Sequence, residues 1–148
     1  MEVQPDFKSL LELFNAHKIK YMIVGGYALA YHGAPRYTGD IDIYVKPDLQ
    51  NAERIMKVLD EFGFGSVVLK LEDFENPDKV VQLGVLPVRV DILTSITGVS
   101  WEDAISGCVE GKYGDVLVKY IGLNDFIINK RAIGRKRDLS DLEALGEE

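Results

Sequence analysis

The chain has 148 residues, so we expect one domain spanning residues 1–148 with a core of its own. Its net charge of −7 argues against sequence-independent binding along a nucleic-acid backbone, which requires many lysines and arginines, but leaves open the end of an RNA. No apolar run approaches the ~20 residues of a membrane span and the first residues lack signal-peptide features, so we expect a cytoplasmic protein without a membrane partner. The single cysteine excludes an internal disulfide.

The first predicted elements are a helix, a strand and a second helix opened by two glycines. Apolar residues at helical spacing predict a helix over residues 7–17, and the β-branched apolar run at residues 21–24 predicts a buried strand. Gly25 and Gly26 then turn the chain into a short helix that ends before Gly33. Backbone N–H groups at a helix N-terminus attract anions, and glycine keeps side chains away from them, so this pair could hold a phosphate. A strand-to-helix turn that needs positive φ or close packing is the alternative.

The next strand places two carboxylates on one face. Asp40, Asp42 and Tyr44 alternate with apolar residues, which is the period-two pattern of a half-buried strand. Two carboxylates about 7 Å apart along one face repel each other unless a cation lies between them, and Mg²⁺ prefers carboxylate oxygens together with substrate phosphates. A solvated edge face is the alternative, but the Gly-Gly pair upstream favours a site for a metal-bound triphosphate.

The middle of the chain continues the alternation of strands and helices. Strands are predicted at residues 66–71, 80–85, 88–93 and 116–121. Helical segments are predicted at residues 51–62 and 101–105, and two further helices from Leu123 and from Asp138. The strands at 80–85 and 88–93 are expected to form a hairpin bent near residues 86–87, and the acidic segment 72–79 is expected to be a loop.

A third acid lies on the strand at residues 88–93, where Arg89 and Asp91 share one face. In two-metal phosphoryl transfer, carboxylates from neighbouring strands bridge the ions, and Asp40, Asp42 and Asp91 suffice for that arrangement. A surface ion pair between Arg89 and Asp91, which would add little stability, is the alternative.

Three further residues could contact a nucleotide. Arg36 lies in the loop before the second strand, where its guanidinium could reach phosphate oxygens bidentately, and the Thr38 hydroxyl could bond a phosphate or stabilise the turn. Lys130 falls within an apolar helical stripe, so its ammonium must find either an anion such as phosphate or water. A loop arginine in water and a threonine that only caps a turn are the alternatives for the first two.

The C-terminal part is locally basic. Five of the 17 basic residues lie between Lys130 and Arg137, and such a patch on an acidic protein could grip triphosphate or RNA. Asp138 is expected to be the N-cap of the last helix and to take no part in catalysis.

These motifs resemble the nucleotidyltransferase superfamily related to DNA polymerase β. The resemblance consists of Gly-Gly before a short helix, the pattern Arg36-x-Thr38-x-Asp40-x-Asp42 and a later single Asp on an apolar strand, and it covers about the first 95 residues. Residues 24–42 look like a minimal prokaryotic member, similar to antibiotic nucleotidyltransferases and to nucleotidyltransferase toxins of abortive-infection toxin–antitoxin systems.

The resemblance implies an α/β (α+β) fold in which helices flank a mixed β-sheet. It implies an NTP bound at Gly25 and Gly26, two Mg²⁺ or Mn²⁺ ions on Asp40 and Asp42, and Asp91 as third ligand and catalytic base. The expected reaction transfers a nucleoside monophosphate from an NTP to an acceptor hydroxyl, with release of pyrophosphate.

The acceptor stays open between a small molecule such as an antibiotic, a tRNA end and a protein side chain. A homodimer or a partner protein could complete the acceptor site. Two other functions are considered: a catalytically weak binding or regulatory module that works through a partner protein, and the toxin half of a toxin–antitoxin pair. The three intact aspartates favour the enzyme, because a decayed site would be expected to lose at least one of them.

Overall fold

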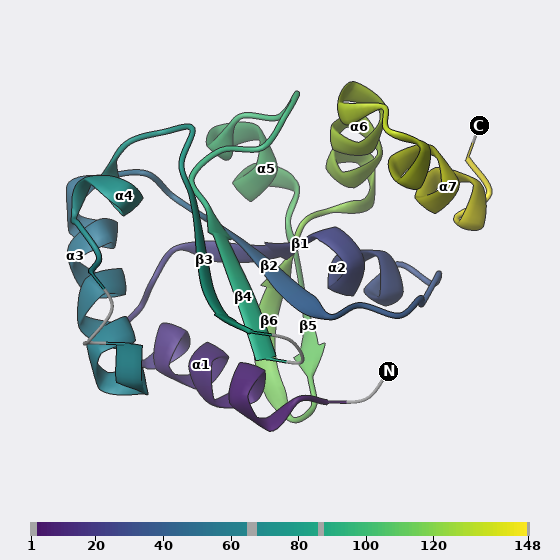
Figure 1. Cartoon of the computed structure of the whole chain (residues 1–148). Coiled ribbons are helices and arrows are strands. Elements are labelled where there is room, and N and C mark those ends of the chain that lie inside the picture. Colours follow the sequence, from purple (N-terminus) through teal and green to yellow (C-terminus); the bar gives the residue numbers. More distant parts are fainter. Residues whose placement is uncertain (1–2, 65–67, 86–87, 148) are drawn as a thin grey trace.

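A six-stranded mixed sheet forms the centre of the computed structural model, which describes residues 3–64, 68–85 and 88–147 (Figure 1). The strands are β1 (Tyr21–Val24), β2 (Asp40–Val45), β3 (Val80–Val85), β4 (Val88–Leu93), β5 (Val109–Tyr113) and β6 (Val116–Tyr120). Their order is β3-β4-β2-β1-β6-β5, with β2 parallel to β4, β1 parallel to β6, and the other neighbours antiparallel. The expected mixed sheet is confirmed.

Helices flank this sheet. They are α1 (Pro5–Ala16), α2 (Gly25–Tyr31), α3 (Leu49–Leu59), α4 (Glu72–Glu75), α5 (Trp101–Gly107), α6 (Leu123–Ile133) and α7 (Lys136–Ala144), with a π-helical turn η1 (Asp60–Phe64) after α3. In Figure 1, α1 and α3 lie together at the lower left, whereas α6 and α7 lie at the upper right, beyond α2. Within the described part of the chain, no helix combines the length and the hydrophobicity that crossing a membrane requires.

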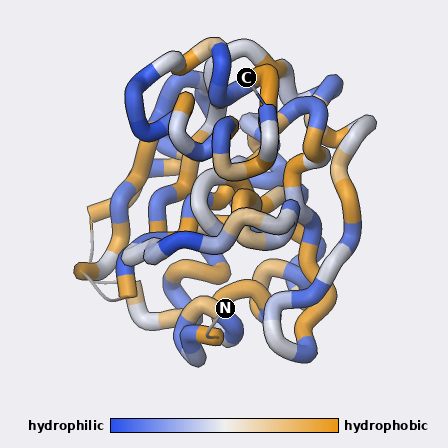
Figure 2. The backbone as a smooth tube through the Cα atoms, turned by 90° about the vertical axis from the view of Figure 1, so that its right-hand side faces the viewer, coloured by the Kyte–Doolittle hydropathy of each residue, from blue (hydrophilic) through white to orange (hydrophobic). Residues whose placement is uncertain are grey.

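One hydrophobic core lies between the sheet and its helices. All four residues of β1 are buried, and the apolar stripe of α1, which includes Leu10 and Phe14, is fully buried against the sheet. Hydrophobic and hydrophilic stretches alternate along the backbone (Figure 2), as expected for amphipathic elements around a shared core. The core thus fixes β1 and β2, the two strands whose ends carry the glycines and the first two aspartates.

The strands at residues 21–24, 80–85 and 88–93 have the predicted bounds, and β3 and β4 form the predicted antiparallel hairpin. The predicted bend at residues 86–87 lies outside the described residues. The helix predicted at residues 51–62 instead runs from Leu49 to Leu59, because the Asp48 carboxylate caps it by accepting a hydrogen bond from the Asn51 N–H at 2.7 Å.

Two predictions are wrong. Residues 68–71 form no strand, and the first residues of that predicted strand lie outside the described ranges. The segment predicted as a loop contains α4, because Phe74 is completely buried and draws this turn onto the core. In addition, β5 was not anticipated: Glu110, Gly111 and Lys112 interrupt its apolar pattern, and it is an edge strand that pairs with β6 alone.

Candidate active site

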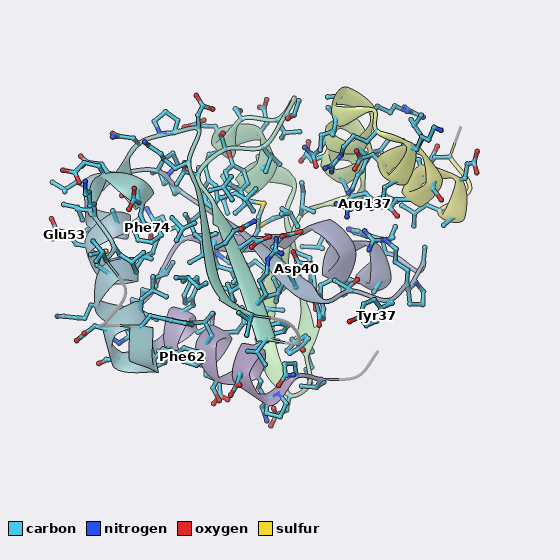
Figure 3. All side chains as sticks on the ribbon, in the orientation of Figure 1. Tyr37, Asp40, Glu53, Phe62, Phe74 and Arg137 are labelled. Atoms are coloured by element: carbon cyan, nitrogen blue, oxygen red, sulfur yellow. The ribbon has the colours of Figure 1, made fainter. Side chains whose placement is uncertain are left out.

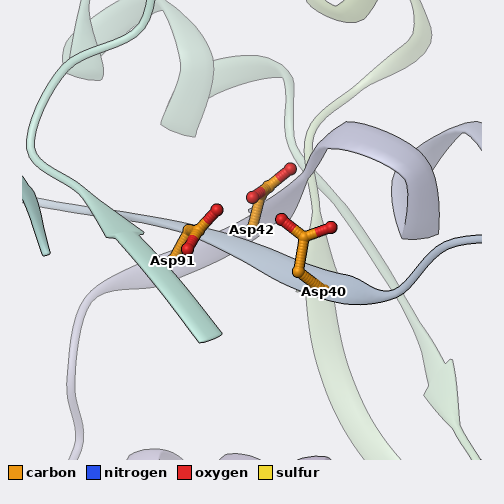
Figure 4. Close-up of side chains that lie close together, drawn as sticks. All are labelled: Asp40, Asp42 and Asp91. Carbon is orange, nitrogen blue, oxygen red and sulfur yellow. The ribbon is translucent and has the colours of Figure 1, made fainter. Parts of the chain in front are cut away.

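The structure brings three carboxylates together on neighbouring strands. Parallel pairing of β2 with β4 sets Asp42 opposite Asp91 and Asp40 opposite Arg89. Because side chains alternate along a strand, Asp40 and Asp42 point to the same face, where Asp91 meets them. One oxygen from each of the three carboxylates lies within 4.8 Å of the other two (Figure 4).

Burial and mutual repulsion raise the pKa of two members of this triad. Burial, followed by the negative charges of Asp40 and Asp91, raises the pKa of Asp42 to about 7, while Lys130 opposes the shift. Burial and the adjacent Asp91 carboxyl raise the pKa of Asp40, against the lowering effect of Arg89 and Arg137. A divalent cation would relieve this repulsion, and three oxygen donors within reach of one ion are the ligands that Mg²⁺ and Mn²⁺ prefer. The residues therefore fit such an ion.

The alternative interpretation of Asp91 is also realised in part. Arg89 donates from Nε and Nη2 to the two carboxylate oxygens of Asp91, each at 3.2 Å. However, Asp91 is only 7% exposed, so this is no surface pair. Arg89 also lies 3.9 Å from Asp40, which places one guanidinium beside two members of the triad.

The Gly-Gly turn packs directly against the triad. Val24, the last residue of β1, pairs with Asp42, so Gly25 begins α2 beside the Asp42 carboxylate. A Cβ on Gly25 would collide with that carboxylate, and a Cβ on Gly26 would collide with the Thr38 hydroxyl. Close packing and positive φ at Gly25 are thus real requirements of the turn, and both glycines leave their backbone open toward the cleft described below.

Arg36 and Thr38 differ in their positions. Arg36 lines the cleft, but the Nε and Nη2 atoms of its guanidinium donate to the two carboxylate oxygens of Asp141 at 2.9 and 3.2 Å. Thr38 donates its hydroxyl to the Arg36 carbonyl at 3.2 Å and supports the turn next to Gly26. Arg36 is therefore a paired cation rather than the free loop arginine of the alternative.

Lys130 finds an anion within the protein. Its side chain projects from α6, the residue is only 4% exposed, and Nζ lies 3.1 Å from Asp138 and 3.3 Å from Asp141. The ammonium is thus paired with carboxylates, whereas the alternative to a phosphate contact was a tip that reaches water. It lines the cleft with its charge already offset by two carboxylates of α7.

The expected N-cap role of Asp138 is wrong. Arg135 is the N-cap of α7, and Asp138 is the third helical residue, whose Oδ2 accepts from the Arg135 N–H at 3.2 Å and from Arg135 Nε at 2.7 Å. Asp138 has no exposed surface. Burial opposes its ionisation, but the hydrogen bonds and charges of Arg135 and Lys130 outweigh burial and lower its pKa to about 2.

A cleft of about 720 Å³ joins these groups. Its lining includes Gly25, Gly26, Asp40, Asp42 and Asp91 with the basic side chains of Arg36, Arg89, Lys130, Arg135 and Arg137. Figure 3 shows Asp40 on the sheet and Arg137 on α7, on the same side of the molecule as the exposed ring of Tyr37. Acids from β2 and β4 are thus gathered in the cleft with cations around them, an arrangement suited to a polyphosphate bound with metal.

Sequence reasoning did not find Asp141, which holds Arg36 and Lys130 from behind the cleft wall. The available signal was its three-residue spacing from Asp138, which puts both carboxylates on one face of a helix. That α7 packs this face against α6 and the loop before β2 depends on tertiary structure and has no local signature.

The sequence matches a family model over residues 4–148, and the family is described as nucleotidyl transferase of unknown function. A comparison with curated protein sequences finds no match. The structure is similar to a candidate nucleotidyltransferase from Thermotoga maritima, at 16% identity and a TM-score of 0.64, over 96% of this chain and 93% of that one.

Two further solved structures share the fold. The lincosamide antibiotic adenylyltransferase LnuA, solved with lincomycin bound, aligns at 15% identity and a TM-score of 0.59 over 97% of this chain and 96% of that one. An antigenic nucleotidyltransferase-like protein from Paracoccidioides brasiliensis aligns at 17% identity and a TM-score of 0.57 over 97% of this chain and 75% of that one. At these identities the likeness concerns the fold.

Proposed function

The chain belongs to the family of nucleotidyl transferases of unknown function, and from that premise we propose that it transfers a nucleoside monophosphate from an NTP to a hydroxyl-type acceptor. The observation that carries this proposal is the convergence of Asp40, Asp42 and Asp91 in one cleft. In the reaction, the acceptor oxygen bonds to the α-phosphorus, the bond from that phosphorus to the bridging oxygen breaks, and pyrophosphate leaves.

In this proposal Asp40, Asp42 and Asp91 would hold two Mg²⁺ or Mn²⁺ ions. Bound ions of this kind neutralise the triphosphate and make the acceptor hydroxyl more acidic. The carboxylates of Asp40 and Asp42 come from one strand and that of Asp91 from the next, so the paired backbones of β2 and β4 fix their spacing. A preformed spacing avoids reorganisation when the charged substrate arrives.

Asp91 takes the proton of the acceptor hydroxyl in the proposed reaction. Its carboxylate is oriented by the two hydrogen bonds from Arg89, and it lies on the edge of the triad nearest β3. A base must lie within hydrogen-bond reach of the proton that it accepts, and an oriented carboxylate in a cleft meets that condition.

The phosphates would lie between the Gly25-Gly26 turn and the cations of Arg36 and Lys130. Neither glycine carries a side chain that would keep a phosphate away from the backbone, and both cations line the same cleft. Thr38 contributes by holding the Arg36 carbonyl and packing against Gly26. Hydrogen bonds from the charged groups of Arg36 and Lys130 to phosphate would be about twice as strong as neutral hydrogen bonds.

The acceptor would be a small molecule, an RNA end or a protein side chain, and a second copy or another protein could complete its site. A toxin of a toxin–antitoxin pair would use the same chemistry. The retention of all three carboxylates supports the enzyme over a catalytically weak binding or regulatory module, because unneutralised acids destabilise a strand face.

Calorimetric titration with ATP, GTP, CTP and UTP, each with Mg²⁺ and again with a chelator, tests this proposal without knowledge of the acceptor. We expect Mg²⁺-dependent binding of at least one NTP, and loss of that binding in Asp42→Asn. Asp6→Asn, an exposed residue of α1, is the control for a change of one carboxylate elsewhere. Absence of binding for all four NTPs by a folded protein would contradict the proposal.

A further inference from the structure

Asp141 has an unusual place in the molecule, since it is 3% exposed and contacts two cations of the cleft without lining the cleft itself. The two cations come from separate parts of the chain: Arg36 from the loop before β2, and Lys130 from α6. One carboxylate on α7 therefore contacts both of the side chains to which the proposed function assigns phosphate contacts.

The geometry at Arg36 is directional. Its Nε and Nη2 atoms both donate to Asp141, so this edge of the guanidinium faces α7. Nη1 lies on the other side, donates to the Tyr37 carbonyl at 3.3 Å, and lies 3.3 Å from the point that a Cβ on Gly26 would occupy. A guanidinium is planar with donors in a fixed fork, so holding one edge fixes the direction of the remaining N–H groups.

Lys130 is held in a similar manner. Its Nζ lies between Asp138 and Asp141, and the Phe126 ring lies 5.5 Å from Nζ. A buried ammonium with two carboxylate partners has little freedom to move. Asp141 is the member of this network that also reaches Arg36, so it links the α6–α7 pair to the Gly-Gly turn.

We propose that Asp141 is a positioning residue of the nucleotidyltransferase site: it holds Arg36 and Lys130 in the orientation in which they contact the phosphates of the bound NTP. This inference rests on the proposed function. Asp141 itself touches no substrate, because Arg36 and Lys130 stand between it and the cleft. Its effect on NTP binding is therefore exerted through these two cations.

Three possible roles of Asp141 predict different results for Asp141→Asn. If only charge mattered, loss of a negative charge near a polyanion would strengthen NTP binding. If Asp141 only fastened α7, any equally destabilising change in α7 would have the same effect. If Asp141 orients Arg36, binding weakens although the site becomes more positive, and the loss depends on the presence of Arg36.

The experiment measures the dissociation constant of the Mg²⁺ complex of whichever of ATP, GTP, CTP and UTP the wild type binds most tightly. The variants are Asp141→Asn, Arg36→Met, the double variant and Leu142→Ala, which removes a buried α7 side chain that does not line the cleft. We expect Asp141→Asn to weaken binding at least about fivefold and the double variant to bind better than the product of the two single effects. Leu142→Ala should change the dissociation constant less than about twofold, which is smaller than the effect expected for Asp141→Asn.

Unchanged or tighter binding by Asp141→Asn, independent effects in the double variant, or an equal loss in Leu142→Ala would each overturn the inference. If Asp141→Asn fails to fold, Asp141→Glu replaces it, since it keeps the charge but moves the carboxylate by one methylene, and binding should still weaken. A wild type that binds none of the four NTPs refutes the proposed function, whereas NTP binding with independent effects refutes only the role of Asp141.

Discussion

Gly25 lies so close to Asp42 that the two residues constrain each other. The Gly25 backbone has a φ of 69°, and a Cβ built on it would lie 3.0 Å from Cγ of Asp42 and still nearer to one of its carboxylate oxygens. The absence of a side chain at position 25 therefore allows the second carboxylate of the triad to occupy its place beside the turn.

Gly25→Ala should consequently disturb the triad as well as the backbone. A non-glycine residue in the left-handed region costs about 1–3 kcal/mol, and displacement of Asp42 should abolish Mg²⁺-dependent NTP binding. Gly33→Ala is the matched control, because Gly33 also has a positive φ, of 110°, but a Cβ added to it would meet no atom within 4 Å. Urea unfolding and calorimetry on both variants check this: destabilisation of both with NTP binding lost only in Gly25→Ala is expected, and retained binding in Gly25→Ala contradicts it.

Asp42→Asn should stabilise the fold in a pH-dependent manner. Asp42 has a pKa of about 7 in the folded chain, against an ordinary value of 3.8, so between these pH values the folded state binds more protons than the unfolded state. The free energy of unfolding of the wild type therefore falls as the pH rises through this window. The advantage of Asp42→Asn should grow from pH 4 to 7 and level off above it, at no more than about 4 kcal/mol, because each unit of pKa corresponds to about 1.4 kcal/mol.

Urea unfolding without metal, at several pH values between 4 and 8, measures this advantage. Asp6→Asn provides the comparison for an exposed carboxylate. An advantage of Asp42→Asn that stays constant across the pH range would show that repulsion within the triad is not its source.

Asp138→Asn should have the opposite effect on stability. Burial opposes ionisation of Asp138, but Arg135 and Lys130 lower its pKa to about 2. The contribution of this carboxylate to the free energy of unfolding is therefore complete above the ordinary pKa of 3.8 and disappears as the pH falls through about 2. Removal of one partner from a buried ion pair costs about 3–5 kcal/mol. The decrease in the free energy of unfolding caused by Asp138→Asn should therefore be largest at pH 7 and should become smaller between pH 4 and 2.

Asp115→Asn is a matched control, since Asp115 pairs with Lys8 at 2.7 Å but is largely exposed. It should have little effect on urea unfolding at any pH because solvent screens such a pair. Equal losses in both variants would contradict the importance of burial around Asp138.

The strand face of each aspartate could be predicted from local patterns, whereas the meeting of Asp91 with Asp40 and Asp42 was implied by the resemblance and depends on the pairing of β2 with β4. Period-two alternation puts Asp40 and Asp42 on one face, and the β-branched run around Asp91 identifies a strand of the same kind. The partners of Arg36 and Lys130 could not be predicted, because they depend on how α7 packs, and helical periodicity indicates a buried face without naming its neighbour. Likewise α4 depends on burial of Phe74, a tertiary effect that overrides the acidic, loop-like composition around it.

Arg137→Gln tests whether the basic rim of the cleft binds the nucleotide. Within residues 3–64, 68–85 and 88–147, the other basic side chains lining the cleft, those of Arg36, Arg89, Lys130 and Arg135, each pair with a carboxylate, whereas Arg137 pairs with none. Its charge is thus available to a phosphate, and Arg137→Gln should weaken NTP binding about five- to tenfold at low salt, with little change in stability.

Lys136→Gln is the control. It removes the same charge from the adjacent exposed residue, which does not line the cleft, and should change NTP binding less than about twofold. Calorimetry at two salt concentrations distinguishes the cases: equal effects of the two variants would mean that the general positive field of α7, rather than a contact from Arg137, attracts the nucleotide.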